Sequence, residues 1–214
     1  MPLEVLFTKG GLVAINKPPG LLVIPGRTPD DQECARDLLA AQLGTRIWVC
    51  HRIDRDTSGV VLFATDEASH RAASMAFEHS EAKKKYLAIV EGVIPGPLDL
   101  QQQITEGRKG KMRVTFPGEQ GKDARTLVKP IEQFANATLV ECEPLTGRQH
   151  QIRVHLKAAG HPLLFDHQYG RKEPLEDLDR TPLHASSLVI ESLGVDVAAP
   201  LPEDLRKVIA RLKG

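Results

Sequence analysis

Short apolar runs of strand length recur along the chain, interspersed with a few amphipathic segments. Several of the runs end at turns that contain Gly or Pro, as strands commonly do. Because strands and helices do not alternate regularly, the pattern favours an α+β fold over a doubly wound parallel sheet. The runs that predict strands are residues 11–16, 21–24, 60–64, 86–90, 138–142 and 188–190.

Four segments have the apolar spacing and the end signals of helices. The first begins at residues 30–31 and stops at Gly44, and the second is capped by residues 65–67. The third covers residues 149–159 and is followed by a glycine, and the last opens at Pro202. The expected inward residues of the first three are Ala35, Leu38, Leu39 and Leu43; Ala68, Ala72, Met75 and Ala76; and Ile152, Leu156 and Ala159.

Composition narrows the class of protein. The 214 residues are 41% hydrophobic and 26% charged, which suffices for a core and argues against disorder. The 28 basic and 28 acidic residues cancel, which excludes a protein that coats nucleic acid by bulk charge, although charge can still be sorted between faces. No membrane-spanning run, no secretory signal and three cysteines without a Cys-x-x-Cys predict a cytoplasmic protein with no membrane partner.

The densest polar cluster is residues 51–59, HRIDRDTSG, directly before the apolar run 60–64. It places Asp54 and Asp56 among arginines, and a carboxylate held ionised beside Arg can act as a nucleophile or base. A solvated, salt-bridged turn explains the same residues and, on composition alone, is the more common case.

A second cluster is residues 146–155, TGRQHQIRVH. If the segment is helical, His150 and Arg153 lie one turn apart on a shared face while Ile152 packs elsewhere. An ordinary amphipathic helix with a polar outer face is the alternative. Metal binding is a weaker one, because His150 and His155 are five apart rather than the four of a helical zinc pair. Phosphate-loop, dinucleotide-binding and serine-hydrolase motifs are absent from the sequence.

Two basic stretches complete the candidate chemistry. Residues 83–85 are three lysines before Tyr86, and residues 108–113 are basic and interrupted by glycine, which predicts a flexible hairpin or loop. Both stretches can contact phosphates, with Tyr86 stacking on a base. A solvated strand edge and a core tyrosine explain the first stretch equally well.

Taken in order, these segments resemble the RluA-type family of pseudouridine synthases over about residues 11–190. HRIDRDTSG resembles the family's catalytic signature, with Ile53 where Leu is usual. Residues 145–156 resemble another motif of the family, with Gln149 where a small polar residue is commoner. Phe165 stands where the family usually has Gly before Asp166. The chain also begins directly in the catalytic domain, so the small N-terminal RNA-binding domain of many relatives is expected to be missing. The other similar segments are residues 16–20, 85–88, 161–163, 169–170 and 183–185.

The resemblance implies isomerisation of uridine to pseudouridine in RNA, without a metal or other cofactor. It implies one catalytic domain over residues 1–214, built on a mixed, mainly antiparallel curved sheet with flanking helices. In that family's terms Asp54 is the nucleophile or charge stabiliser, Tyr86 stacks under the uracil, and Arg153 pairs with Asp54. The expected substrate-binding residues are His51, Arg52, Arg55, Thr57, Arg148, His150 and Ile152.

The resemblance also limits the partner. Compact members of the family act on tRNA, on large-subunit ribosomal RNA, or on both, so a stem-loop of such an RNA is the expected substrate and a monomer the expected state. Two other functions compete with this one. A catalytically silent RNA-binding or ribosome-assembly module would share the fold, and a hydrolase would use the Asp54/Asp56 pair as acid and base. The hydrolase leaves Tyr86 and both basic segments unexplained.

Overall fold

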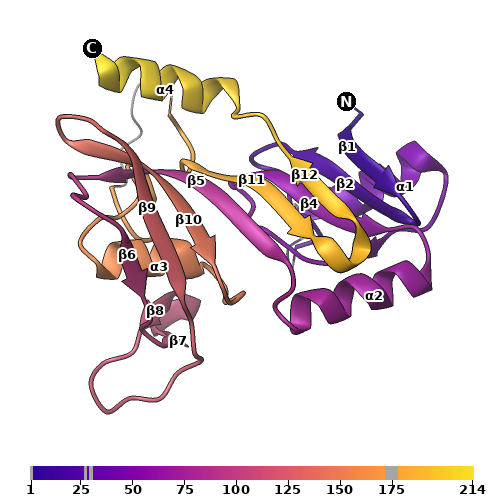
Figure 1. The fold of residues 1–214 in the computed structure, drawn as a ribbon, viewed down its shortest axis with the longest axis horizontal. Helices are drawn as coiled ribbons and strands as arrows, with labels where there is room; N and C mark the ends of the chain where they lie inside the picture. The colour runs from indigo at the N-terminus through magenta and orange to yellow at the C-terminus, as the bar shows by residue number, and fades with distance from the viewer. Residues whose placement is uncertain (1, 27, 29–30, 172–177) are drawn as a thin grey trace. The chain divides into compact units, whose positions relative to one another are not determined.

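The structure is a computed structural model that describes residues 2–26, 28, 31–171 and 178–214 (Figure 1). The chain divides into two compact units. Unit 1 consists of Met1–Lys84 and His184–Leu201, and unit 2 of Lys85–Leu183 and Pro202–Gly214. Neither unit is continuous in sequence, and a single catalytic domain over residues 1–214 stays a prediction. Within the described ranges, no helix is long and apolar enough to cross a membrane.

Unit 1 is built on a mixed sheet. The strand β4 pairs antiparallel with β2 and β3 and parallel with the start of β11, while β1 pairs with β2 and β12 with β11, both antiparallel. Only the β4–β11 pairing is parallel among the strand pairs described here, so the sheet is mainly antiparallel, as expected. The strands are β1 (Glu4–Lys9), β2 (Leu12–Lys17), β3 (Trp48–Val49), β4 (Ser58–Ala64), β11 (Leu183–Ile190) and β12 (Val195–Ala198).

Two helices cover the two faces of this sheet, α1 (Ala35–Leu43) and α2 (Glu67–Glu78) (Figure 1). Every residue of β4 is buried, which explains why its sequence is continuously apolar rather than alternating. Successive strand side chains point to opposite faces. One set packs with α2: Leu12, Ala14, Val60, Leu62, Ala64, Ala73 and Ala76. The other packs with α1: Val13, Ile15, Val61, Phe63, Ala35 and Leu39.

The beginning of α1 differs from the prediction. The helix starts at Ala35 rather than at residues 30–31, because the carbonyls of Leu22 and Val23 accept the N–H groups of Ala35 and Arg36 and so satisfy the first turn. Residues 21–24 are therefore a helix-capping segment with one isolated bridge, not the predicted strand. Of the expected start, residue 30 lies outside the described residues. The predicted stop is confirmed, since Gly44 has left-handed backbone at the C-terminus.

The predicted cap of α2 is confirmed, but its predicted inward face is wrong in part. Asp66 accepts a hydrogen bond from the N–H of Ser69 at 2.8 Å, as an N-cap should. The buried residues of the helix are Ala73 and Ala76, whereas Met75 is 47% exposed. The helix is therefore rotated from the predicted stripe, with Ala73 in place of Met75 on the buried face.

Unit 2 contains an antiparallel sheet in the order β5–β10–β9–β6 and a separate two-stranded hairpin, β7–β8. The helix α3 (Gln151–Ala158) packs its apolar side on this sheet, and α4 (Glu203–Lys213) buries Leu205, Val208 and Ile209. For the basic segment 108–113 the sequence predicts either a hairpin or a loop, and the β7–β8 pairing confirms the hairpin. The strands are β5 (Lys83–Glu91), β6 (Leu98–Leu100), β7 (Ile104–Glu106), β8 (Met112–Val114), β9 (Thr126–Gln133) and β10 (Ala137–Pro144), and the 3-10 helix η2 (Arg108–Gly110) lies between β7 and β8; in unit 1, the 3-10 helix η3 (Glu191–Leu193) lies between β11 and β12.

The α+β class is confirmed by these strand pairings and helices. The three cysteines are free thiols, Cys34 and Cys142 buried and Cys50 half-buried. Burial raises the pKa of the Cys50 thiol to about 12, so it stays protonated at neutral pH.

Gly59 generates a stability prediction for unit 1. Its φ is +109°, and a Cβ added there would lie 2.1 Å from the Ala185 carbonyl oxygen, where β11 begins beside β4. We expect Gly59→Ala to lower the free energy of unfolding by about 3 kcal/mol or more, measured by urea denaturation. Gly147→Ala is the matched control, since no atom lies within 4 Å of its Cβ position, and it should change stability by less than about 0.5 kcal/mol. Equal losses in the two variants would contradict the close approach.

Candidate functional site

The first polar cluster forms a turn between β3 and β4 in unit 1. The Thr57 N–H donates to the Asp54 carbonyl at 3.2 Å, which closes the turn one residue before β4 begins. Asp54 and Asp56 are half-buried, whereas Arg52 is exposed and has no hydrogen bond or ion pair to another described residue. The turn thus presents a carboxylate at a fixed point beside a buried strand.

A buried lysine holds this turn from behind. Lys17, at the end of β2, is 0% exposed, and its ammonium donates to the carbonyls of Pro18, Leu21 and Arg55 at 2.7–2.8 Å. An ammonium has three donors, so these bonds replace the water it loses on burial. The lysine therefore ties residues 18–21 to the Asp54 turn. The resemblance singled out residues 16–20, but nothing in their sequence indicated where the Lys17 side chain would go.

Arg55 is bound on its outer side. Its Nη1 lies 2.8 Å from the Asp31 carboxylate, and its Nε donates to the Gly20 carbonyl at 3.0 Å. The side chain is still 50% exposed. The predicted RNA contact at Arg55 therefore involves a guanidinium that already joins Gly20 and Asp31 to the turn.

Two of the predicted substrate-binding residues lie at the base of the turn. The His51 Nε2 accepts the Leu62 N–H at 3.0 Å, and its ring lies 4.6 Å from that of Phe77. Burial, with the nearby charge of Lys84, lowers the pKa of His51 to about 3, so the imidazole is neutral. Thr57 is 1% exposed, and its hydroxyl has no partner among the described residues. These positions support the turn more directly than they reach a large substrate.

In unit 2, the second cluster is not helical where the pattern places His150. This residue has left-handed backbone, with φ of 54°, and α3 begins only at Gln151, so His150 and Arg153 do not share a helical face as predicted. Instead, His150 Nδ1 is hydrogen-bonded to the Tyr169 hydroxyl at 2.8 Å. Ile152 is 5% exposed and packs in the core of unit 2, which leaves almost no surface for its predicted RNA contact.

Arg153 is a buried residue of α3 that pairs with Asp166. Its Nε and Nη2 donate to the two carboxylate oxygens at 2.8 and 2.9 Å, and Asp166 is 0% exposed. Burial alone would raise the pKa of Asp166, but the hydrogen bonds and charge of Arg153, with the N–H groups of Gln168 and Tyr169, outweigh it and lower that pKa. The carboxylate thus stays charged and fixes the plane of the guanidinium. An amphipathic helix with a polar, solvated face is excluded by this burial.

Tyr169 joins several parts of unit 2. Its hydroxyl accepts the Met112 N–H at 3.1 Å, and its ring lies 5.0 Å from the Arg153 guanidinium. Together with the bond to His150, these contacts attach the β7–β8 hairpin to the loop after α3. Sequence reasoning assigned no role to Asp166 or Tyr169, and the only signal for either was its place in the family-like block at 161–170.

The remaining predicted residues of unit 2 have separate surroundings. Tyr86 is half-buried on β5 and packs against the core, as the bland interpretation expected. Arg148 is exposed, and its Nε donates to the Asp123 carbonyl at 2.8 Å. His155 is 0% exposed and braces Thr126 and Gln102 at 2.9 Å, with its pKa lowered by burial. In the part of the chain that the structure describes, no cluster of His, Cys, Asp or Glu is suited to hold a metal.

Two of the three lysines before Tyr86 form ion pairs with glutamates. Lys83 lies 2.7 Å from Glu191 and Lys85 lies 3.0 Å from Glu141. Lys84 is half-buried, and burial lowers its pKa. Exposed pairs of this kind contribute little stability, yet they neutralise the charge that a phosphate contact would need. The strand-edge interpretation of residues 83–85 is therefore the better supported one.

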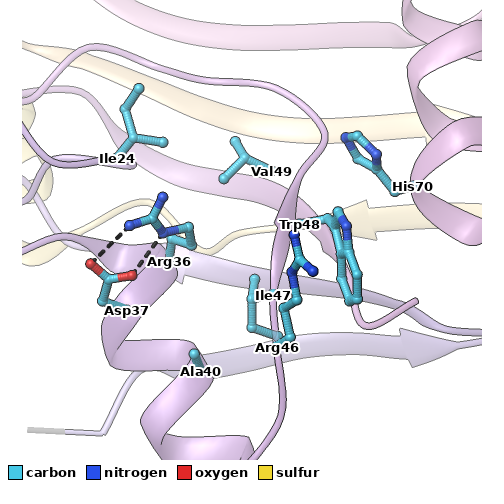
Figure 2. A pocket seen from close by; sticks show the side chains of 9 residues that line it. All are labelled: Ile24, Arg36, Asp37, Ala40, Arg46, Ile47, Trp48, Val49 and His70. Carbon is cyan, nitrogen blue, oxygen red and sulfur yellow. Dashed lines mark hydrogen bonds and ion pairs between the residues drawn. The ribbon is translucent and has the colours of Figure 1, made fainter. Parts of the chain in front are cut away.

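Unit 1 also has a hollow of about 510 Å³ that contains none of the predicted site residues (Figure 2). Arg36 is ion-paired with Asp37 there, and the Arg46 guanidinium lies 4.7 Å from the centre of the Trp48 ring. The Arg36–Asp37 pair thus neutralises part of the charge that lines the hollow, and no residue of the Asp54 turn lines it. Its lining residues are Ile24, Arg36, Asp37, Ala40, Arg46, Ile47, Trp48, Val49 and His70.

Comparisons with known proteins point the same way as the motifs. A sequence model of the family described as RNA pseudouridylate synthase matches residues 11–158. Ribosomal large subunit pseudouridine synthase D of Zymomonas mobilis subsp. mobilis is 34% identical over 233 residues, covering 99% of this chain and 73% of that protein. Dual-specificity RNA pseudouridine synthase RluA of Yersinia pestis is 36% identical over 190 residues, covering 87% and 91%. The solved structure of human RNA pseudouridylate synthase domain containing 4 has a TM-score of 0.82 at 27% identity, covering 98% of this chain and 93% of that one.

The buried, neutral His51 makes the stability of unit 1 depend on pH. The unfolded imidazole binds a proton below pH about 6.5, whereas the folded one stays neutral down to about 3. The stabilising effect is complete above the unfolded pKa and is lost as pH falls through this window, by at most about 1.4 kcal/mol per pH unit. We expect urea denaturation to show a smaller loss of stability for His51→Gln than for wild type between about pH 7 and about pH 5. The same pH dependence in both proteins would contradict a buried neutral histidine.

Proposed function

Because the chain belongs to the RluA-type family of pseudouridine synthases, and is thus an RNA-modifying isomerase, we propose that Asp54 is the group that acts on the target uridine. The observation that carries this proposal is the construction of the turn: Lys17 binds it through the Arg55 carbonyl, and Arg55 braces it from outside. A carboxylate on such a fixed turn is held ready without reorganisation at the moment of reaction.

The chemistry requires little besides positioning. The bond from the ribose anomeric carbon to the base nitrogen breaks, the same ribose is rejoined to C5 of the base, and C5 loses a proton while the freed ring nitrogen gains one, so nothing is consumed. An ionised Asp54 can serve attack on the sugar, addition to the base, or a glycal route. We assign Tyr86 to stacking under the uracil and to removing the proton, and Arg153 to keeping Asp54 ionised. The two hydrogen bonds to Asp166 fix the plane of the Arg153 guanidinium, which is the observation that supports a positioning role for this residue.

For the substrate we propose a stem-loop of tRNA, of large-subunit ribosomal RNA, or of both. The similar protein of Zymomonas mobilis is a ribosomal large subunit pseudouridine synthase and that of Yersinia pestis is a dual-specificity RNA pseudouridine synthase, which supports this class. A uridine inside a stem must be flipped out, at a cost of a few kcal/mol, before a carboxylate can reach it. We further propose a cytoplasmic monomer.

Exposed cations are the proposed RNA contacts. Arg52 in unit 1 and Arg108 and Lys111 in unit 2 are exposed and have no ion-pair partner among the described residues. Arg148 and Arg55 are exposed but already hydrogen-bonded to backbone carbonyls, so they suit contacts that fix the register of the RNA. We propose that His150 also contacts the RNA, in the position that its hydrogen bond to Tyr169 fixes.

The first test is pseudouridine mapping in a strain that lacks the gene, restored with wild type, Asp54→Asn or Asp56→Asn. We expect one or more pseudouridines to vanish on deletion and to return with wild type but not with Asp54→Asn, because loss of a nucleophile costs about a thousandfold or more in rate. The neighbouring carboxylate is the matched control, and Asp56→Asn should restore the site.

Purified proteins complete this test by release of tritium from C5 of labelled uridine. Asp54→Asn should keep the RNA affinity and unfolding midpoint of wild type. Appreciable turnover by Asp54→Asn would remove Asp54 from the mechanism. Binding without turnover by wild type would indicate a silent RNA-binding module, and free uracil as the product would indicate a hydrolase.

The hairpin generates a second prediction. Neutralising Arg108, Lys109 and Lys111 to Gln should reduce the slope of log K against log salt by about 0.7–0.9 for each phosphate that the hairpin no longer neutralises. Arg113→Gln made together with Glu119→Gln should leave the slope unchanged, because this ion pair of 2.6 Å carries no net charge. The measurement is filter binding of a transcribed substrate RNA over a salt series. An unchanged slope in the triple variant would show that the hairpin does not grip phosphates.

A further inference from the structure

Phe116 is a large apolar side chain displayed to solvent just beyond the basic hairpin. It is 66% exposed, more than the other large apolar residues that the structure describes as exposed. Those others are Val5, Leu43, Met75, Val93 and Ile131, and none is on the hairpin. A single exposed apolar side chain is common in folded proteins, so it is the surroundings of the ring, rather than its exposure alone, that indicate a role.

The ring sits on a turn that is held at many points. The Glu119 N–H donates to the Phe116 carbonyl at 3.0 Å, and Gly118 supplies the positive φ, +82°, that this kind of turn requires. On the far side, Gln103 accepts the N–H of Thr115 at 2.9 Å through its carbonyl and that of Gly121 at 3.0 Å through its side chain. The turn is therefore a rigid support rather than a loose loop, and the ring is presented in a fixed place.

One face of the ring is covered by a cation. The Arg113 guanidinium lies 4.5 Å from the ring centre, and Glu119 binds it with two hydrogen bonds of 2.6 Å. Glu119 also accepts the Phe116 N–H at 3.0 Å, and its pKa is lowered to about 2 by Arg113, so the pair persists at neutral pH. Arg113 is therefore held against one face of the ring, and the exposed face of Phe116 is the opposite one.

We propose that Phe116 is a stacking platform for an unpaired nucleobase of the substrate RNA, a contact that rests on the proposed function. Bases stack on exposed aromatic rings regardless of sequence, and a guanidinium behind the ring fits such a sandwich. The exposed Arg108 and Lys111 nearby in the chain complement the phosphates on either side of that base. A protein partner fits poorly, because a stable interface buries about 800 Å² per side around several apolar anchors, and the described hairpin has one.

The platform is joined to the residues assigned to catalysis in unit 2. Met112 donates its N–H to Tyr169, whose ring lies under Arg153. Phe116 is the fourth residue after Met112, so its Cα lies at most about 14 Å from that of Met112. A base stacked on Phe116 would thus be held by the same part of unit 2 that contains Tyr169 and Arg153.

The test compares Phe116→Leu with Phe116→Trp on an RNA transcript that wild type converts. Leucine keeps the apolar bulk but has no π face, so Kd should rise about tenfold, or about 1.4 kcal/mol, while tryptophan should bind as wild type or better. Ile131→Ala, which removes another exposed apolar side chain of unit 2, is the control and should not change Kd. The tritium-release kcat at saturating RNA should be the same in all four proteins. A Kd for Phe116→Leu within about twofold of wild type would overturn the proposal.

A spectroscopic measurement tests the contact directly. Trp48 is the only tryptophan in the chain, so Phe116→Trp made together with Trp48→Phe places the sole indole on the turn. Stacking should quench its fluorescence on addition of RNA, and unchanged fluorescence with bound RNA would contradict stacking. The proposed function fails separately, when wild type binds RNA without releasing tritium; the effect of Phe116→Leu on Kd then still decides whether the ring contacts a base.

Discussion

The polar architecture of unit 2 depends on the buried ion pair between Arg153 and Asp166. Breaking one partner of such a pair leaves an uncompensated charge in a low-dielectric interior, at a cost of about 3–5 kcal/mol. Here Asp166 also accepts the N–H groups of Gln168 and Tyr169, so the same carboxylate sets the position of the tyrosine. Tyr169 in turn holds His150 and the hairpin. One buried acid therefore orients a guanidinium, a histidine and a basic hairpin, and Lys17 plays the corresponding part for the Asp54 turn through three carbonyls.

Features of the fold that arise from local chemistry could be predicted from the sequence. The apolar run of β4, the Asp66 cap of α2 and the Gly44 stop of α1 each depend on residues within one or two turns of chain. The start of α1 could not be placed, because its first N–H groups are satisfied by Leu22 and Val23, whose carbonyls come from a tertiary arrangement. Likewise, nothing local shows that β4 is joined by β11 from more than a hundred residues away.

The residues of the candidate site also fall into those that the sequence indicated and those that it did not. Asp54, Arg153 and Tyr86 could be singled out because their motifs are dense and resemble a family signature. Side chains that act through distant partners could not: Asp166 and Tyr169 look ordinary until α3 brings Arg153 to them. Ile152 shows the opposite case, since it occupies a motif position for which an RNA contact was predicted, while its side chain packs in the core. A motif thus identifies a segment, while burial decides which of its members face a ligand.

The pairing of β4 with β11 has a consequence for the newly made chain. Ser58 Oγ and His184 Nδ1 form a buried hydrogen bond at 2.9 Å across 126 residues of sequence. During synthesis, the apolar strand β4 must wait for that partner with part of one edge uncovered, and uncovered strand edges invite pairing with other chains. The stretch Lys85–Leu183 emerges in the meantime and contains most of unit 2. Unit 1, which contains Asp54, is thus begun first and completed late, and a chain that ends before residue 184 lacks the strand that pairs with the start of β4.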